Sequence, residues 1–211
     1  MIEPYLRQSA LDHLGLAGRT IDAAGDIAVR LAEKPLPAAV NLRGDAGDPA
    51  FVAALRDALG VEPPTAPNTT ATGGSVTLLW LGPDEWLAVE HAATPEAEMR
   101  LASKLRNALG DLHAAVTEVG EQYACIHIAG NHARDVIAKG CPLDLHPRVF
   151  GGTGHCAQSH LSKASIILHQ VDDRGADGAA YDLYVRRSFS DYLWHWLESA
   201  AREYGLAVVA P

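Results

Sequence analysis

The sequence predicts an α+β protein with mainly antiparallel sheets, built from two related strand–helix units. Apolar residues alternate at period two in several short runs, as is typical of half-buried strands, and only a few segments show helical spacing. Both halves of the chain end with a hairpin, a helix and a strand, an order typical of this fold class. Residues 40–44 and 126–130 are each a strand that leads into a helix, which suggests that the two units are related.

The N-terminal 26 residues differ from the rest of the chain. Residues 1–26 show weak hydrophobic periodicity and contain Gly15, Gly18 and Gly25, which predicts an extended arm. We expect residues 27–211 to form a single compact domain with halves at about 27–120 and 121–211.

Proline and glycine residues mark the ends of a helix and a turn in the first half of the chain. Asp48 and Pro49 supply an N-cap and a first-turn proline for a helix that ends at Gly60. Residues 82–85 read Gly-Pro-Asp-Glu and predict the turn of a hairpin. Strands are expected at residues 27–31, 39–42, 75–81, 86–90 and 115–119, and a second helix is expected to begin at residues 94–96.

The second half closes with an amphipathic helix over residues 189–204. Its apolar stripe includes Trp196, whereas Trp194 lies about 110° from the centre of that stripe and is predicted on the flank, under another segment of this chain or under a partner. Ser188 and Asp191 match the start of a capping box. Before this helix, strands are expected at 124–128, 158–161, 165–169 and 181–185, with a short helix through 136–138.

Composition excludes several classes of protein. The 211 residues carry a formal net charge of -9 without a Lys/Arg cluster, which argues against nucleic-acid binding. No apolar run approaches the ~20 residues of a membrane span, and the N-terminus lacks a basic signal region. The three widely spaced cysteines, Cys125, Cys141 and Cys156, fit reduced thiols. We therefore expect a cytoplasmic protein that binds neither nucleic acid nor membrane.

Residues 142–150 form a connector between two predicted elements. Pro142 and Pro147 lack an amide hydrogen and fix φ, so this segment is expected to be rigid and irregular. It contains Asp144 and His146, but no complete set of reacting groups. The connector therefore predicts a shaped surface.

Three sequence blocks carry a resemblance to a known family. They are Trp-Leu-Gly-Pro-Asp-Glu-Trp-Leu at 80–87, Cys-Pro-Leu-Asp-Leu-His-Pro at 141–147 and Arg-Ser-Phe-Ser-Asp-Tyr-Leu-Trp at 187–194. In this order they resemble the gamma-subunit family of heterotetrameric sarcosine oxidases, and the resemblance extends from about Ile27 to the end. It implies a fold similar to the folate-binding region of aminomethyltransferases of the glycine-cleavage T-protein type.

The resemblance also implies a function. Such a subunit is noncatalytic, in a complex that oxidatively demethylates sarcosine to glycine with O2 and tetrahydrofolate and gives 5,10-methylenetetrahydrofolate and H2O2. FAD, FMN, NAD and zinc are then expected in the alpha, beta and delta partner subunits and not in this chain. We expect no catalytic, cofactor-binding or metal-binding residue here. The expected subunit interface, chiefly toward alpha, includes Pro142, Leu143, Asp144, His146, Pro147, Phe150 and Trp194.

The spacing of the residues gives little support to metal binding, phosphate binding or nucleophilic catalysis. His155 and His160 are five residues apart, which fits neither a helical ligand pair nor a compact Cys/His site with Cys156. The glycine-rich residues 151–154 lack a following helix that would hold a phosphate. Ser159 or Ser162 with His160, and Cys141 with His146, have no orienting acid at a diagnostic spacing.

Two rival functions stay open. A stand-alone folate-binding protein similar to aminomethyltransferases needs a carboxylate in a central cavity, and Asp144 and Asp182 are the candidates. Residues 139–141, Lys-Gly-Cys, are similar to a motif of T-protein relatives that maintain iron–sulfur enzymes, but Pro142 to Asp144 depart from its continuation. A general scaffold unconnected to flavoenzymes is the other rival.

Overall fold

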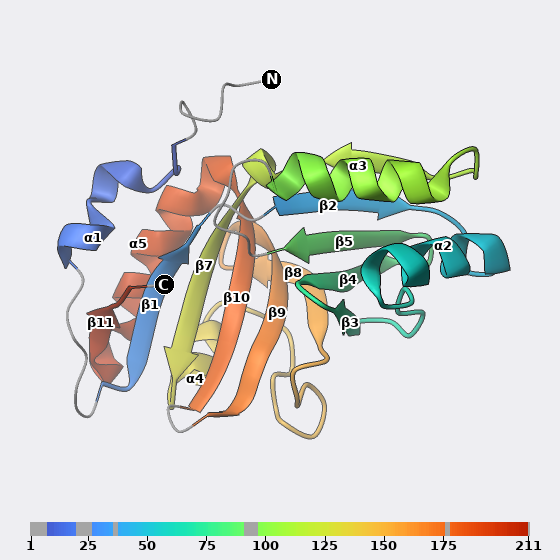
Figure 1. Ribbon diagram of the computed structural model, residues 1–211. Helices are drawn as coiled ribbons and strands as arrows, with labels where there is room; N and C mark the ends of the chain where they lie inside the picture. The colour runs from blue at the N-terminus through green and yellow to red at the C-terminus, as the bar shows by residue number, and fades with distance from the viewer. Residues whose placement is uncertain (1–7, 20–26, 36–37, 91–96, 176–177, 211) are drawn as a thin grey trace. The chain divides into compact units, whose positions relative to one another are not determined.

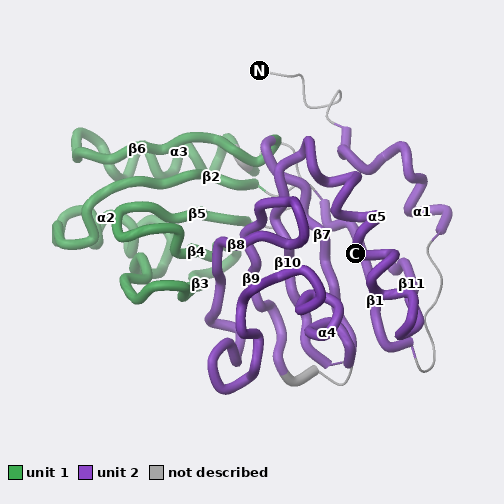
Figure 2. The backbone as a smooth tube through the Cα atoms, turned by 180° about the vertical axis from the view of Figure 1, so that it is seen from behind, with its two compact units in different colours: residues 1–7, 36–121 green, residues 8–35, 122–211 purple. Residues whose placement is uncertain are grey.

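Two sheets, each packed against helices, organise the chain, which separates into two units (Figures 1 and 2). This computed structural model describes residues 8–19, 27–35, 38–90, 97–175 and 178–210. Unit 1 contains the described residues between 38 and 121, and unit 2 contains those of 8–35 and 122–210. Among the described strands only one pair is parallel, so the predicted α+β class with mainly antiparallel sheets is confirmed.

Unit 1 is a five-stranded antiparallel sheet, here sheet B, with two helices on one face (Figure 1). Val40 and Leu42 of the sheet and Phe51 and Leu55 of the first helix are fully or almost fully buried in its core, together with Leu105 of the second helix. In the order of sheet B, the strands are β3 (Thr70–Gly73), β4 (Val76–Gly82), β5 (Glu85–Glu90), β2 (Ala38–Arg43) and β6 (Ala115–Glu118), and the helices are α2 (Pro49–Leu59) and α3 (Ala97–Leu109).

The helix signals of unit 1 act as the sequence predicts. The Asp48 side chain accepts a hydrogen bond from the Ala50 amide at 2.8 Å, Pro49 occupies the first helical position, and Gly60 ends α2 in the left-handed region with φ of 74°. The hairpin of β4 and β5 turns at residues 82–85. The predicted start of α3 at residues 94–96 lies outside the described residues.

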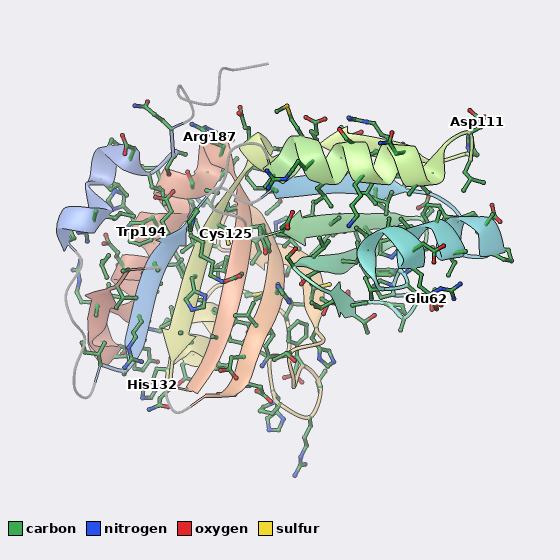
Figure 3. The ribbon with its side chains drawn as sticks, in the orientation of Figure 1. Glu62, Asp111, Cys125, His132, Arg187 and Trp194 are labelled. Carbon is green, nitrogen blue, oxygen red and sulfur yellow. The ribbon has the colours of Figure 1, made fainter. Side chains whose placement is uncertain are left out.

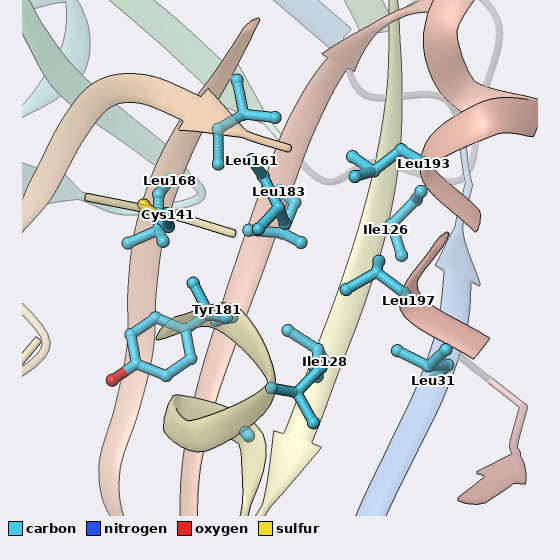
Figure 4. Close-up of a cluster of buried hydrophobic side chains, with 14 of the residues drawn as sticks. Leu31, Ile126, Ile128, Cys141, Leu161, Leu168, Tyr181, Leu183, Leu193 and Leu197 are labelled. Carbon is cyan, nitrogen blue, oxygen red and sulfur yellow. The ribbon is translucent and has the colours of Figure 1, made fainter. Parts of the chain in front are cut away.

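Unit 2 is a six-stranded sheet, here sheet A, covered on one face by α4 (Ala133–Ala138) and α5 (Ser190–Ala201). Leu31, Ile126 and Leu183 of the sheet meet Leu193 and Leu197 of α5 in the core (Figure 4). In the order of sheet A, the strands are β11 (Leu206–Val208), β1 (Val29–Lys34), β7 (Tyr123–Gly130), β10 (Gly178–Arg186), β9 (Ala164–Gly175) and β8 (Cys156–Leu161).

The first strand belongs to unit 2, although the sequence groups it with the first half. In β1, Leu31 is the register partner of Ile128 in β7 and of Val208 in β11. Strand pairing between residues so far apart in the sequence cannot be predicted from the residues next to β1. The two units are therefore not two consecutive halves of the sequence that meet near residue 120.

The predicted extended arm is not extended where the structure describes it. Residues 8–19 contain a 3-10 turn, η2 (Asp12–Leu14), and a short helix, α1 (Leu16–Arg19). Leu11 is fully buried in the core of unit 2, so this segment is part of that unit. Residues 1–7 and 20–26 of the predicted arm lie outside the described residues.

The C-terminal helix buries a different face from the predicted one. Trp194 is 0% exposed and packs in the core with Leu193 and Leu197, whereas Trp196 is only partly buried and Tyr192 is 37% exposed. The predicted flank position of Trp194 is therefore wrong, because the buried face includes residues 190, 193, 194, 197 and 201. Of the two predicted coverings of Trp194, the structure shows cover by other segments of this chain.

The predicted capping box at this helix does not form. Phe189 is the N-cap residue and makes no side-chain hydrogen bond to the helix. A 3-10 turn, η4 (Arg187–Phe189), leads into α5, and the Ser190 hydroxyl donates to the Arg187 carbonyl at 2.8 Å. Ser188, the predicted first residue of the capping box, therefore lies within this turn and not at the N-cap of α5.

Among the described residues, none of the helices combines the length and the apolar character required to cross a membrane.

Candidate subunit-contact surface

The connector, residues 142–150, lies between α4 and β8 and is anchored inside unit 2 by two of its own residues and by the adjacent Cys141. Cys141, Leu145 and Phe150 are 5–6% exposed and belong to the core of unit 2, in which Figure 4 labels Cys141. Between these anchors the chain turns outward. The exposed residues of the connector are Pro142, Asp144, His146, Pro147, Arg148 and Val149.

Local hydrogen bonds fix the shape of the connector. The Asp144 carboxylate accepts a hydrogen bond from the His146 amide at 2.9 Å, and the His146 carbonyl accepts from the amides of Val149 and Phe150 at 2.8 and 2.9 Å. At Gly151 a Cβ atom would lie 1.9 Å from the Pro147 carbonyl oxygen, so only glycine fits this close approach. The connector therefore presents a shaped outer surface.

Two of the predicted interface residues point inward. Phe150 is 6% exposed and Trp194 is 0% exposed, so neither side chain is available at the surface of the chain. An aromatic ring at the end of a rigid loop gains more from burial in the unit's own core than from exposure to water. Figure 3 labels Trp194 on α5. Of the other predicted residues, Pro142, Asp144, His146 and Pro147 are exposed and Leu143 is partly buried.

Sequence reasoning missed three exposed apolar side chains in unit 2. Val149 of the connector is 61% exposed, and Phe189 and Tyr192 at the start of α5 are 44% and 37% exposed. The Tyr192 hydroxyl lies 2.7 Å from that of Ser162. Helical periodicity assigns Phe189 and Tyr192 to the buried stripe. In the structure α5 buries a different face, and both side chains point to the surface.

Asp182 lies in a polar cluster on the face of sheet A that α4 and α5 do not cover. Its side chain is fully buried, and its two carboxylate oxygens lie 2.7 Å from Lys34 Nζ and 2.7 Å from His127 Nδ1. Asp182 and His127 are register partners on β10 and β7. Burial alone would raise the pKa of Asp182, but the hydrogen bond from His127 and the charge and hydrogen bond of Lys34 hold it below its ordinary value.

The other candidate residues, His155, His160 and Cys141, make separate local contacts. No group of three or more His, Cys, Asp or Glu side chains able to hold a metal occurs among the described residues. His155 Nδ1 lies 3.3 Å from the Gly152 carbonyl, and His160 Nδ1 lies 3.4 Å from the Ser165 hydroxyl. Cys141 donates to the Ser159 hydroxyl across 3.7 Å.

Cys125, Cys141 and Cys156 are buried and form no disulfide, as the sequence suggests. Burial raises the pKa of the Cys125 thiol well above its ordinary value, because the thiolate would be desolvated. The nearby carboxylates of Asp182 and Glu33 raise it further, against the opposing effect of Lys34. Cys125 is therefore held as an unreactive thiol.

Comparisons with known proteins agree with the resemblance seen in the sequence. Residues 43–203 match the model of the sarcosine oxidase, gamma subunit family. The chain is 32% identical over 206 residues to a sarcosine oxidase subunit gamma of Corynebacterium sp. strain U-96, which covers 97% of this chain and 95% of that one. A subunit gamma of Arthrobacter sp. is 31% identical over 208 residues, with the same coverage.

Two solved structures extend this comparison. One chain of the heterotetrameric sarcosine oxidase of Corynebacterium sp. U-96, in complex with pyrrole 2-carboxylate, matches with a TM-score of 0.81 and 32% identity, over 97% of this chain and 100% of that chain. The glycine cleavage system aminomethyltransferase T of Bartonella henselae matches with a TM-score of 0.65 and 11% identity, over 97% of this chain and 59% of that one. The second match confirms the predicted aminomethyltransferase-like fold and carries no functional inference.

Proposed function

Because this chain belongs to the sarcosine oxidase gamma subunit family, we propose that it is the noncatalytic, structural subunit of a heterotetrameric sarcosine oxidase. The complex oxidatively demethylates sarcosine to glycine with O2 and tetrahydrofolate, and it yields 5,10-methylenetetrahydrofolate and H2O2. In this proposal the alpha, beta and delta subunits hold FAD, FMN, NAD and zinc, and alpha is the main partner. We also propose a cytoplasmic location, which the three buried cysteines without a disulfide support.

The connector is the observation that carries this proposal. Its anchors Cys141, Leu145 and Phe150 are buried, whereas Pro142, Pro147 and Val149 are exposed. An irregular segment whose shape is held from inside and by its own hydrogen bonds loses little conformational entropy when a partner covers it. The connector is therefore suited to a preorganised protein–protein contact.

The surroundings of the candidate carboxylates also favour a structural role over a folate carrier. Both oxygens of Asp182 are engaged by Lys34 and His127, and one oxygen of Asp144 accepts the turn hydrogen bond of His146. Engaging a pterin or a substrate nitrogen through Asp182 would require breaking one of these contacts in a fully buried position.

Assembly tests the proposal directly. An affinity-tagged chain is co-expressed with alpha, beta and delta subunits and purified, and flavin absorbance and sarcosine-dependent H2O2 formation are measured. We expect a flavin-containing active complex, and no turnover by the chain alone. Sarcosine turnover by the isolated, cofactor-free chain would contradict the noncatalytic role.

A calorimetric titration of the isolated chain with tetrahydrofolate separates the rival function. A stand-alone folate-binding protein would bind this ligand tightly, with a Kd on the order of 1–10 μM, corresponding to about -8 to -7 kcal/mol. We expect no such binding. Purification without any flavoprotein partner would favour a general scaffold instead.

A further inference from the structure

A cleft at the start of α5 contains two adjacent arginines. Its volume is about 580 Å³, and it is lined by Ala10, Gln122, Arg186, Arg187 and Ser188, all of unit 2. Arg186 ends β10 and Arg187 begins η4, so the two side chains leave the sheet at the point where the helix begins. Figure 3 labels Arg187 at this end of sheet A.

Among the described residues, both arginines are held in place by contacts with uncharged groups. The guanidinium carbon of Arg186 lies 5.1 Å from the ring centroid of Tyr123, its register partner on β7, and Tyr123 is 8% exposed. Arg187 donates to the Gln8 carbonyl. A guanidinium stacked on a buried ring keeps its in-plane N–H donors free for a carboxylate.

Within the described part of the chain, neither guanidinium has a carboxylate oxygen within 4 Å. By contrast, five other arginines each form an ion pair with Asp or Glu: Arg19, Arg43, Arg56, Arg106 and Arg134. The charge of Arg187 acts on Glu33, whose carboxylate accepts the Ser9 hydroxyl hydrogen bond. Two adjacent cations that form no ion pair with a described carboxylate, in a chain of net charge -9, are a local excess of positive charge.

The residues beside the cleft are typical of a protein contact. Phe189 follows the lining residue Ser188 directly and is 44% exposed, and Tyr192 lies one helical turn further on and is 37% exposed. Arginine and aromatic side chains are enriched in protein–protein interfaces and among the residues that contribute most to binding.

From this geometry we propose that the Arg186–Arg187 cleft receives a carboxylate side chain of another subunit of the oxidase, with Phe189 and Tyr192 packing against apolar groups around it. The guanidinium of Arg186 offers a bidentate pair of donors, and Ser188 and Gln122 offer further hydrogen bonds. This inference rests on the proposed function, since it names a second contact surface in the same complex.

Charge reversal tests the cleft in the assembled complex. Binding of the Arg186→Glu variant to the other three subunits is compared with that of the wild type and of Lys163→Glu, which reverses an exposed cation of unit 2 outside the cleft. We expect Arg186→Glu to weaken binding at least about tenfold and Lys163→Glu to change it less than about twofold. Circular dichroism of each free variant establishes that the chain has folded.

Cross-linking identifies the occupant without relying on a disruptive change. In Arg186→Lys the introduced amine can be condensed with a nearby carboxylate by a carbodiimide, and mass spectrometry of the complex locates the new amide bond. A cross-link to an Asp or Glu of another subunit supports the proposal. A cross-link only within this chain, or none in an intact complex, overturns it.

The outcomes also separate this inference from the proposed function. If the wild type binds the other subunits and Arg186→Glu binds equally well, the cleft is not an interface and the proposed function stands. If the wild type binds none of them, both fail.

Discussion

The connector and the polar cluster of sheet A both contain a candidate carboxylate, but they differ in how the protein surrounds it. Asp182 is fully buried between Lys34 and His127, whereas Asp144 is exposed and its contact is with the backbone of its own turn. The buried carboxylate of Asp182 links three strands of sheet A, because its partners Lys34 and His127 lie on β1 and β7 and Asp182 itself lies on β10. An exposed one in a turn gives shape to a surface. Neither is positioned as a free acid or base.

The connector's inner anchor gives the largest expected effect. Phe150→Ala should lower the free energy of unfolding by about 4 kcal/mol, because it removes an aromatic side chain that is 6% exposed in the core of unit 2. Chemical denaturation measures this change.

The neighbouring side chain is the matched control. Val149→Ala, at 61% exposure, should change stability by less than about 0.5 kcal/mol while weakening binding to the partner subunits. Equal destabilisation by both changes would contradict the division of the connector into inner anchors and outer surface.

The polar cluster comes next. Asp182→Asn should lower the free energy of unfolding by about 3 kcal/mol, because it leaves the partly buried Lys34 and His127 without their carboxylate. The control is Asp84→Asn, which breaks the exposed ion pair with Arg43 and should cost less than about 1 kcal/mol. A similar small loss for both variants would show that the cluster does not stabilise sheet A.

The same cluster predicts a pH dependence. The folded-state pKa of Asp182 is lowered from 3.8, because the hydrogen bond from His127 and the interactions with Lys34 outweigh the effect of burial. The unfolded chain therefore takes up this proton first as pH falls, so the stabilisation is present above the unfolded pKa and is lost as pH falls through the folded pKa. The stability difference between the wild type and Asp182→Asn should shrink between about pH 5 and pH 3. A constant difference over this range would contradict the lowered pKa.

The turn carboxylate gives the smallest effect. Asp144→Ala removes the acceptor of the His146 amide at an exposed site and should cost about 1 kcal/mol of stability. Because it loosens the connector, it should also weaken subunit binding, which titration of the partner subunits measures. Asp144→Asn keeps an acceptor oxygen and should restore most of both.

Local signals predicted most elements of this fold and few of its long-range contacts. Asp48, Pro49 and Gly60 placed the limits of α2, since capping and left-handed termination depend on neighbouring residues. By contrast, nothing near Leu31 indicates that β1 pairs with β7 and β11 of unit 2. Pairing of that kind depends on packing across the whole chain.

The candidate surface shows the same limit. The prolines identified the connector, and Pro142, Asp144, His146 and Pro147 are exposed as an interface requires, but Phe150 is an anchor. Trp194 is not available as an interface residue, because the buried face of α5 differs from the predicted one. The observed face contains Trp194 and leaves Tyr192 exposed. The cluster around Asp182 joins residues far apart in sequence, with no motif to mark it.

Hydrogen–deuterium exchange of the connector tests most directly whether this surface serves assembly. Exchange of peptides that cover residues 142–150 is measured by mass spectrometry in the free chain and in the complex with alpha, beta and delta subunits. Burial of the connector under a partner predicts clearly slower exchange in the complex. Equal exchange in both states, with the complex fully formed, would contradict the role proposed for it.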